Sequence, residues 1–93
     1  MATVRQRMIE LLETEARDVR EISKALRIRE REVIDHLPHI ARTAAARNRK
    51  LEVTPSICLA CGYRFKDRKQ LKPPSRCPQC RNERVESPLY RVR

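Results

Sequence analysis

Four cysteines in two matched pairs constrain the fold of this chain more than any other feature. The spacing is C-x2-C, fifteen intervening residues and C-x2-C, formed by Cys58, Cys61, Cys77 and Cys80. A gap of two residues lets one tight turn direct both sulfurs at a metal ion about 2.3 Å away. Two such turns, brought together by a hairpin, complete a tetrahedral site. The spacing therefore predicts a metal-binding ribbon.

Two disulfides or four separate buried thiols are the alternative to a metal site. Scattered thiols would not fall into two matched pairs, and disulfides are disfavoured in a reducing compartment. We expect such a compartment, the cytoplasm, because the first residues, MATVRQ, contain no apolar signal segment. Zinc and iron both accept four thiolates. Since four cysteine ligands leave no open coordination position, we expect one structural Zn²⁺, with iron as a substitute.

The composition narrows the classes of partner. Lys and Arg number 22 against 12 Asp and Glu, which gives a formal net charge of +10 and favours double-stranded DNA as the partner. Aromatic residues make up 3% and Gly62 is the one glycine, which argues against base-stacking platforms and phosphate-binding glycine loops. No apolar run approaches the roughly 18 residues of a membrane span, so no membrane partner is expected.

Residues 1–50 have the hydrophobic spacing of three helices. Capping-box patterns at Thr3–Gln6 and Asp18–Glu21 predict two helix starts, the first helix ending near Glu15–Ala16. Arg27–Ile28 should form a tight break before a third helix that continues to about Asn48. Pro38 either kinks that helix or divides it into two abutting helices. A short second helix joined tightly to a third is typical of a helix-turn-helix, although a generic three-helix bundle has the same spacing.

Residues 51–93 combine the cysteines with two strand-like segments. Residues 51–53 and 89–92 alternate in hydropathy as strands do, and both cysteine pairs lie between them. The simplest topology pairs the two segments as a sheet packed on the helices. In a winged helix this sheet is the wing, so the cysteine ribbon would be an insertion in the wing.

Three short motifs indicate a family. They are Gly62-Tyr63-Arg64-Phe65, Pro74-Ser75-Arg76-Cys77-Pro78 and Glu86-Ser87-Pro88. With them the chain resembles the small archaeal, predicted transcription regulators that fuse a helix-turn-helix domain to a rubredoxin-like zinc ribbon. The resemblance covers nearly the whole chain. It implies an α+β fold, a winged helix-turn-helix with the zinc ribbon inserted in the wing, zinc bound by the four cysteines, and DNA binding in transcription control. Many zinc ribbons have Gly after the fourth cysteine, where this chain has Arg81, and Asn82 is expected to supply the turn.

Three groups of basic residues are candidates for DNA contact. The candidates are Arg27, Arg29 and Arg31 at the start of the third helix, Arg42, Arg47, Arg49 and Lys50 at its end, and Lys66, Arg68, Lys69 and Lys72 in the ribbon. The N-terminal residues of a recognition helix normally read bases. Here Glu30, Glu32 and Asp35 would repel the phosphates, so we expect a larger share of the contact from the other two groups. Asp35 is alternatively an ion-pair partner of Arg31 or Arg42.

Two alternative functions come from other classes. The acidic residues on the third helix also suit a protein-interaction adaptor of the transcription machinery, and an iron site would make the ribbon a rubredoxin-like electron carrier. No arrangement of nucleophile and base stands out, and the cysteines are assigned to the metal. We therefore do not expect an enzyme.

Overall fold

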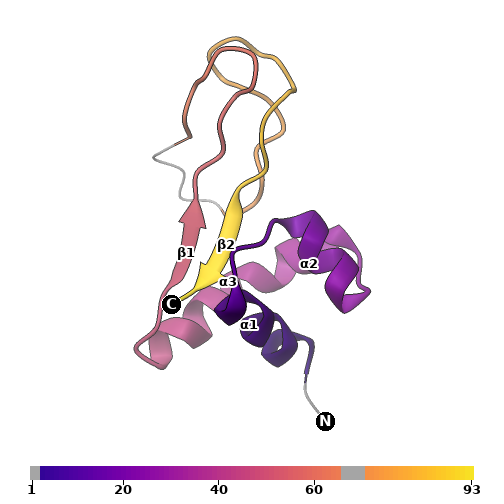
Figure 1. Cartoon of the computed structure of the whole chain (residues 1–93), viewed down its shortest axis with the longest axis vertical. Coiled ribbons are helices and arrows are strands. Elements are labelled where there is room, and N and C mark those ends of the chain that lie inside the picture. The colour runs from indigo at the N-terminus through magenta and orange to yellow at the C-terminus, as the bar shows by residue number, and fades with distance from the viewer. Residues whose placement is uncertain (1–2, 66–70) are drawn as a thin grey trace.

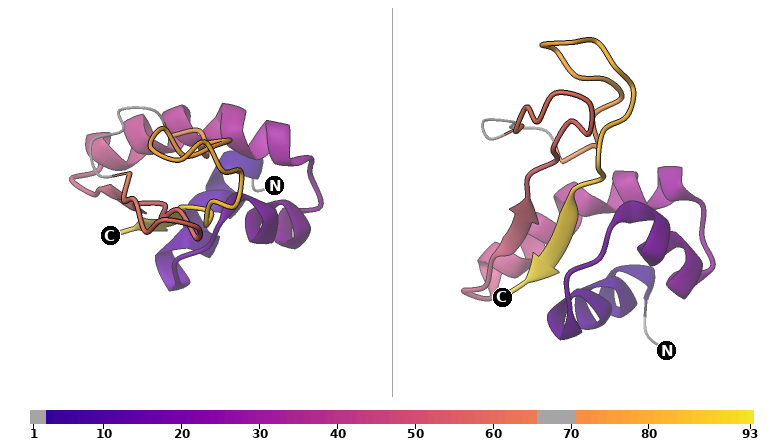
Figure 2. Two further views of the ribbon diagram at one scale, coloured as in Figure 1. Left: turned by 90° about the horizontal axis from the view of Figure 1, so that it is seen from above. Right: turned by 45° about the horizontal axis from the view of Figure 1, so that its top comes forward.

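Three helices form the first half of the chain, and two short strands connect it to the cysteine-containing half (Figure 1). The computed structural model describes residues 3–65 and 71–93. Within these residues the elements are α1 (Val4–Thr14), α2 (Val19–Leu26), α3 (Glu30–Ala46), β1 (Leu51–Thr54) and β2 (Leu89–Val92). The molecule measures 45 × 28 × 20 Å, because the cysteine-containing part projects from the helical half (Figure 2).

Side-chain caps fix the first two helix starts where the sequence predicts them. At α1, the Thr3 hydroxyl accepts from the Gln6 N–H, and the Gln6 side chain accepts from the Thr3 N–H, both at 3.1 Å. At α2, the Asp18 carboxylate accepts from the Glu21 N–H at 2.8 Å. Such caps satisfy backbone N–H groups that have no partner within the helix. Both predicted starts are confirmed.

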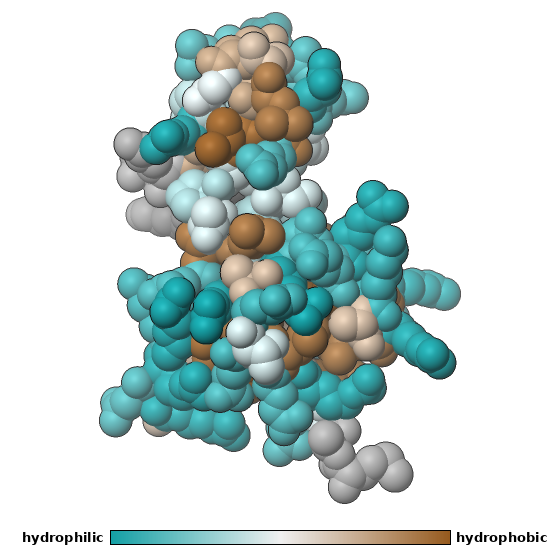
Figure 3. Space-filling view, in the orientation of Figure 1, coloured by the Kyte–Doolittle hydropathy of each residue, from teal (hydrophilic) through white to brown (hydrophobic). Residues whose placement is uncertain are grey.

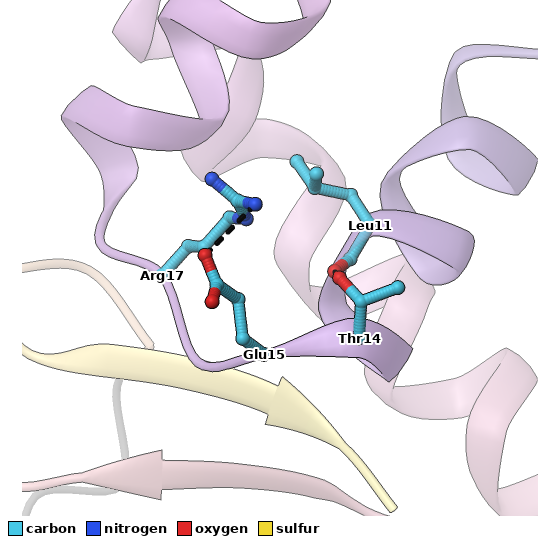
Figure 4. A network of polar contacts seen from close by, with 4 residues as sticks. All are labelled: Leu11, Thr14, Glu15 and Arg17. Atoms are coloured by element: carbon cyan, nitrogen blue, oxygen red, sulfur yellow. Dashed lines mark hydrogen bonds and ion pairs between the residues drawn. The ribbon is translucent and has the colours of Figure 1, made fainter.

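The segment between α1 and α2 is held by its own polar contacts (Figure 4). The Thr14 hydroxyl donates to the Leu11 carbonyl at 2.6 Å at the end of α1. Glu15 and Arg17 then form an ion pair at 2.9 Å. The chain leaves α1 in an extended conformation at Glu15, and this brings Arg17 beside β2.

α3 is one continuous helix, with Pro38 inside it. The alternative of two abutting helices is therefore wrong. Buried residues precede and follow Pro38 on one face of α3, whereas Pro38 itself is exposed. Residues before and after Pro38 pack the same face of the helix against the core. Because this packing stabilises both sides of the proline, the helix tolerates the loss of the one hydrogen bond that proline cannot donate. α3 ends two residues before the predicted Asn48, which adopts a left-handed conformation (φ 58°) and lets the Arg49 N–H reach the Ala44 carbonyl at 2.8 Å.

The main hydrophobic core lies between the three helices and the sheet. The helices contribute ten buried side chains and β2 contributes Tyr90 and Val92; the helical members are Met8, Ile9, Leu12, Val19, Ile22, Leu26, Val33, Leu37, Ile40 and Ala44. Seen from above, α3 runs along one side of this layer, opposite α1 and α2 (Figure 2). None of the helices in the described part of the chain has both the length and the apolar character required to cross a bilayer.

β1 and β2 form a two-stranded antiparallel sheet in which Leu51 pairs with Val92 and Thr54 with Leu89. β2 also pairs on its other edge with Arg17, through N–H to carbonyl bonds in both directions between Arg17 and Tyr90 at 3.0 and 2.8 Å. The Tyr90 side chain is completely buried, and its hydroxyl donates to the carbonyl of Leu71. β2 therefore contacts three parts of the molecule: Arg17 in the connection between α1 and α2, the helical core, and Leu71 between the two cysteine pairs.

Candidate metal centre

The four cysteines lie together in two tight turns that project beyond the sheet. Their sulfurs all lie within 4.8 Å of one another. The first cysteine of each pair, Cys58 or Cys77, is buried, whereas the second, Cys61 or Cys80, is exposed. One side of the sulfur cluster therefore faces the interior of the ribbon and the other faces solvent.

The two cysteine turns use the same backbone hydrogen bonds. In the first turn, the Cys58 carbonyl accepts from the Gly62 N–H at 2.9 Å, and the Cys58 N–H donates to the Tyr63 carbonyl at 2.8 Å. In the second, the Cys77 carbonyl accepts from the Arg81 N–H at 2.9 Å, and the Cys77 N–H donates to the Asn82 carbonyl at 2.9 Å. The bonds join residues at the same spacing in both turns, so each turn presents its two sulfurs to the centre in the same way.

A left-handed residue follows the second cysteine of each pair. It is Gly62 (φ 80°) in the first turn and Arg81 (φ 62°) in the second. The expectation that Asn82 supplies this conformation is wrong. The shared hydrogen-bond pattern places the turn residue directly after the cysteine, so Arg81 must adopt a conformation that side chains with a Cβ disfavour.

Adding a glycine at position 81 and removing the glycine at position 62 should change the stability of the ribbon in opposite directions. We expect Arg81→Gly to stabilise the metal-loaded ribbon and Gly62→Ala to destabilise it, each by about 1 kcal/mol. A Cβ on Gly62 would meet no atom within 4 Å, so the second effect is conformational and not steric. Denaturant unfolding of the two variants measures both changes. If Arg81→Gly is less stable than the wild type, the Arg81 side chain makes a contribution that outweighs its backbone strain.

Isolated strand pairings and a second, smaller core lie around the sulfurs. Isolated strand pairings join Ile57 to Arg64 and Cys58 to Val85. Phe65 is buried beside Cys58 and Cys77, and the Tyr63 ring meets the Phe65 ring edge-on at a centroid distance of 5.1 Å. This core is much smaller than the helical core. Burial alone is therefore insufficient to stabilise the ribbon, which needs a cross-link or a metal.

The sulfur geometry fits a tetrahedral metal and excludes disulfides. The sulfurs of Cys58 and Cys80, and those of Cys61 and Cys77, are 3.6 Å apart, and each of these contacts joins one turn to the other. A disulfide requires about 2.05 Å, so the four cysteines are free. Four sulfurs placed about 2.3 Å from a common centre at tetrahedral angles would be about 3.8 Å apart. The described residues therefore fit one structural zinc ion, held by the four thiolates.

The pKa values of the thiols show that this cluster favours a cation. Burial raises the pKa of Cys58, but hydrogen bonds from the backbone of Cys61 and Ala60 outweigh it and lower the pKa to about 6. At Cys61 a backbone bond from Tyr63 lowers the pKa, yet burial and the neighbouring sulfurs raise it to about 12. The low pKa of Cys58 favours a thiolate there, whereas the raised pKa of Cys61 disfavours a second one beside it. A divalent cation removes this conflict, since all four ligands must be thiolates.

The basic residues proposed to contact DNA lie in separate places. Arg27 and Arg29 form the turn between α2 and α3, and Arg31 is exposed in the first turn of α3. Arg42 and Arg47 lie near the other end of a 17-residue helix, about 25 Å long. Lys72 is exposed between the cysteine pairs, and Lys66, Arg68 and Lys69 lie outside the described residues. The candidates at the start of α3 and those near its end are therefore separated by most of the length of the helix.

Two candidates at the end of α3 have local roles. Arg49 forms an ion pair with Glu13 of α1, so its charge is already partly compensated. Lys50 is exposed, and its backbone pairs with that of Arg93 at the end of the sheet, with 2.8 Å for both bonds. Arg93 in turn forms an ion pair with Glu52 at 2.8 Å. Of the residues from Arg42 to Lys50, Arg42, Arg47 and Lys50 remain exposed without an ion-pair partner in the described ranges.

Two structural roles were not anticipated from the sequence. The left-handed Arg81 could have been found, because its position after Cys80 matches that of Gly62 after Cys61. The contact between Tyr90 and Leu71 had no comparable signal, since it joins residues 19 apart that belong to no shared motif.

Comparisons with known proteins agree with this division of the chain. Residues 3–51 match the family described as PF0610-like, N-terminal. Residues 55–93 match the PF0610 rubredoxin-like zinc beta-ribbon domain. Among solved structures, the chain is similar to the solution NMR structure of protein PF0610 from Pyrococcus furiosus, with a TM-score of 0.81 and 26% identity over 97% of this chain and 88% of that chain. No curated protein matches.

Proposed function

Because this chain belongs to the PF0610-like family, with the N-terminal domain followed by the rubredoxin-like zinc ribbon, we propose that it is a DNA-binding transcription regulator. In this proposal residues 1–50 form a winged helix-turn-helix and residues 51–93 form a wing that carries the ribbon. One zinc ion stabilises the ribbon, and the protein needs no catalytic activity of its own.

The observation that carries the proposal is the connection between α2 and α3. Only residues 27–29 separate the two helices, and Arg27 at the end of α2 is left-handed (φ 56°). The Ile28 N–H donates to the Ser23 carbonyl at 3.1 Å and closes the turn. A second helix joined to a recognition helix by a turn of three or four residues is the defining feature of a helix-turn-helix.

The sheet supports the winged form of this motif. β1 follows α3, β2 returns beside β1 after the ribbon, and β2 pairs on its other edge with Arg17 between α1 and α2. A short strand between the first two helices and a hairpin after the third is the strand order of winged helices. In that arrangement the hairpin tip is the wing, and here the chain between β1 and β2 is the zinc ribbon (Figure 1).

The surface charge favours nucleic acid as the partner. The formal net charge is +10, and hydrophilic side chains cover most of the helical half in the view of Figure 3. The face of α3 opposite the core carries Arg31 and Arg42, both exposed. Basic side chains that meet phosphates release counterions, which would make the affinity fall steeply with salt.

Removing positive charge near the end of α3 should weaken DNA binding and its salt dependence. We expect the double variant Arg42→Gln/Lys50→Gln to flatten the slope of log affinity against log salt by about 0.9 for each phosphate that is no longer neutralised, equally for all sequences. The measurement is fluorescence anisotropy with a random-sequence duplex at several salt concentrations. The control, Arg7→Gln/Arg20→Gln, removes the same charge from exposed positions on α1 and α2. Equal slopes for both variants would contradict a local contact, and no salt-dependent binding by the wild type would contradict the function.

A protein-interaction adaptor is the second candidate, and two observations favour it. Glu30 and Glu32 place two carboxylates in the first turn of α3. Leu59, between the first two cysteines, is 61% exposed and is the more exposed of the two large apolar side chains on the described surface. A Leu59→Asp variant that loses a transcription-machinery partner but keeps DNA affinity would support the adaptor. The electron-carrier alternative predicts bound iron and a red colour in protein purified without added metal.

A further inference from the structure

The outward face of α3 has an alternating charge pattern. Val33, Leu37, Ile40 and Ala44 turn one face of the helix to the core. Because a helix has 3.6 residues per turn, Arg31, Asp35, Pro38 and Arg42 lie on the opposite face, and all four are exposed. The spacing of Arg31, Asp35 and Pro38, at i, i+4 and i+7, matches positions that a recognition helix uses to reach base edges.

Asp35 has no ion-pair partner among the residues that the structure describes, and neither has Arg31. The expectation that Asp35 holds Arg31 or Arg42 is therefore wrong for this structure. Arg31 precedes Asp35 by four positions. This order is the less favourable one for an ion pair on a helix, where the acidic residue is better placed before the basic one. An exposed carboxylate on a face turned to DNA lowers affinity for phosphate, so its presence there needs another explanation.

We propose that Arg31 and Asp35 read bases together, and that they select a guanine and a cytosine within two base pairs of each other in duplex DNA. The proposal rests on the DNA-binding function proposed above. In the major groove an arginine binds guanine O6 and N7, and a carboxylate accepts from the N4 amino group of cytosine. The two residues lie one helical turn apart, about 5.4 Å along the axis, while neighbouring base pairs are about 3.4 Å apart.

This assignment gives the carboxylate a role in discrimination. Asp35 weakens binding to every duplex by repelling the backbone, and it regains free energy only where an amino group faces it. Thymine in the same position presents O4, an acceptor that would repel the carboxylate. A C·G to T·A exchange therefore replaces an attraction by a repulsion.

Binding-site selection from a random duplex library, with the metal-loaded full chain, tests the proposal. The wild type should prefer the guanine and the cytosine, each by at least about 5-fold, the lower limit of a good base contact. Asp35→Ala should lose the cytosine preference and bind random duplexes more tightly, and Arg31→Ala should lose only the guanine preference. The control Glu10→Gln removes one exposed carboxylate from α1 and should keep both preferences.

The other outcomes separate this proposal from the function on which it rests. If Asp35→Ala keeps the cytosine preference and resembles Glu10→Gln, Asp35 is a solvated surface residue and the inference is overturned. If the wild type binds all duplexes alike, with a steep salt dependence, the base-reading pair is wrong while DNA binding stands. If no variant and no wild-type protein binds duplex DNA at low salt, the proposed function fails.

Discussion

Removal of the metal should unfold the described part of the ribbon between β1 and β2, residues 55–65 and 71–88, and leave most of the helical half and the sheet folded. Among the described residues, the ribbon has a small core around Phe65 and two isolated strand pairings, whereas the helices share a separate core. Structural zinc contributes about 10–16 kcal/mol in small zinc-binding peptides near neutral pH, which is comparable with the whole stability of a typical domain. The ribbon should therefore lose its order when a chelator removes one equivalent of metal under reducing conditions. Backbone amide signals in NMR, read separately for the two halves, measure this.

A cysteine variant provides the matched test of the same point. Cys77→Ser removes a buried ligand and should prevent stable metal binding, whereas Ser75→Ala changes an exposed neighbour and should not. A chromogenic chelator should detect one equivalent of metal in the Ser75→Ala protein and much less in the Cys77→Ser protein. An ordered ribbon in wild-type protein without metal would show that the four sulfurs do not need a cation.

Truncation of Tyr90 should be the most damaging single change outside the cysteines. Its ring is completely buried among the helices, and its backbone pairs with both β1 and Arg17. Tyr90→Ala should lower the free energy of unfolding by about 3–5 kcal/mol, as for other large aromatic side chains in cores. The measurement is denaturant unfolding of metal-loaded protein, followed by the helical circular dichroism signal.

Tyr90→Phe separates the ring from its hydroxyl group. This variant keeps the buried ring but cannot donate to the Leu71 carbonyl, so it should lose only about 0.5–1.5 kcal/mol. It should also weaken the attachment of Leu71 to the helical core, visible as faster amide exchange near that residue. Equal losses for Tyr90→Phe and Tyr90→Ala would assign the effect to the hydroxyl group and contradict the packing role of the ring.

Features set by local chemistry could be predicted from the sequence. The Thr3–Gln6 cap and the Asp18 cap depend on residues three positions apart, and the meeting of the cysteine pairs depends on their spacing. Each cap and each C-x2-C pair is contained in four consecutive residues. These features therefore needed no knowledge of distant contacts.

Several features set by contacts between distant residues could not be predicted in the same way. The continuity of α3 across Pro38 depends on the core that holds both sides of the proline. The pairing of Arg17 with Tyr90 joins residues far apart in the sequence, and the residues around Arg17 have no alternating hydropathy that would predict a strand there. The candidate DNA contacts illustrate the same limit, because a count of basic residues does not distinguish exposed Arg42 from Arg49, which is paired with Glu13.

The positions of the two tyrosines give each half of the protein its own optical probe. The chain has two tyrosines and no tryptophan. Tyr63 lies in the ribbon against Phe65, and Tyr90 lies in the helical core. In a Tyr63→Phe protein the remaining tyrosine emission reports on the helical core alone, and the difference from the wild type reports on the ribbon. Stopped-flow fluorescence can therefore follow the order in which the two halves assemble after metal is added, without any attached label.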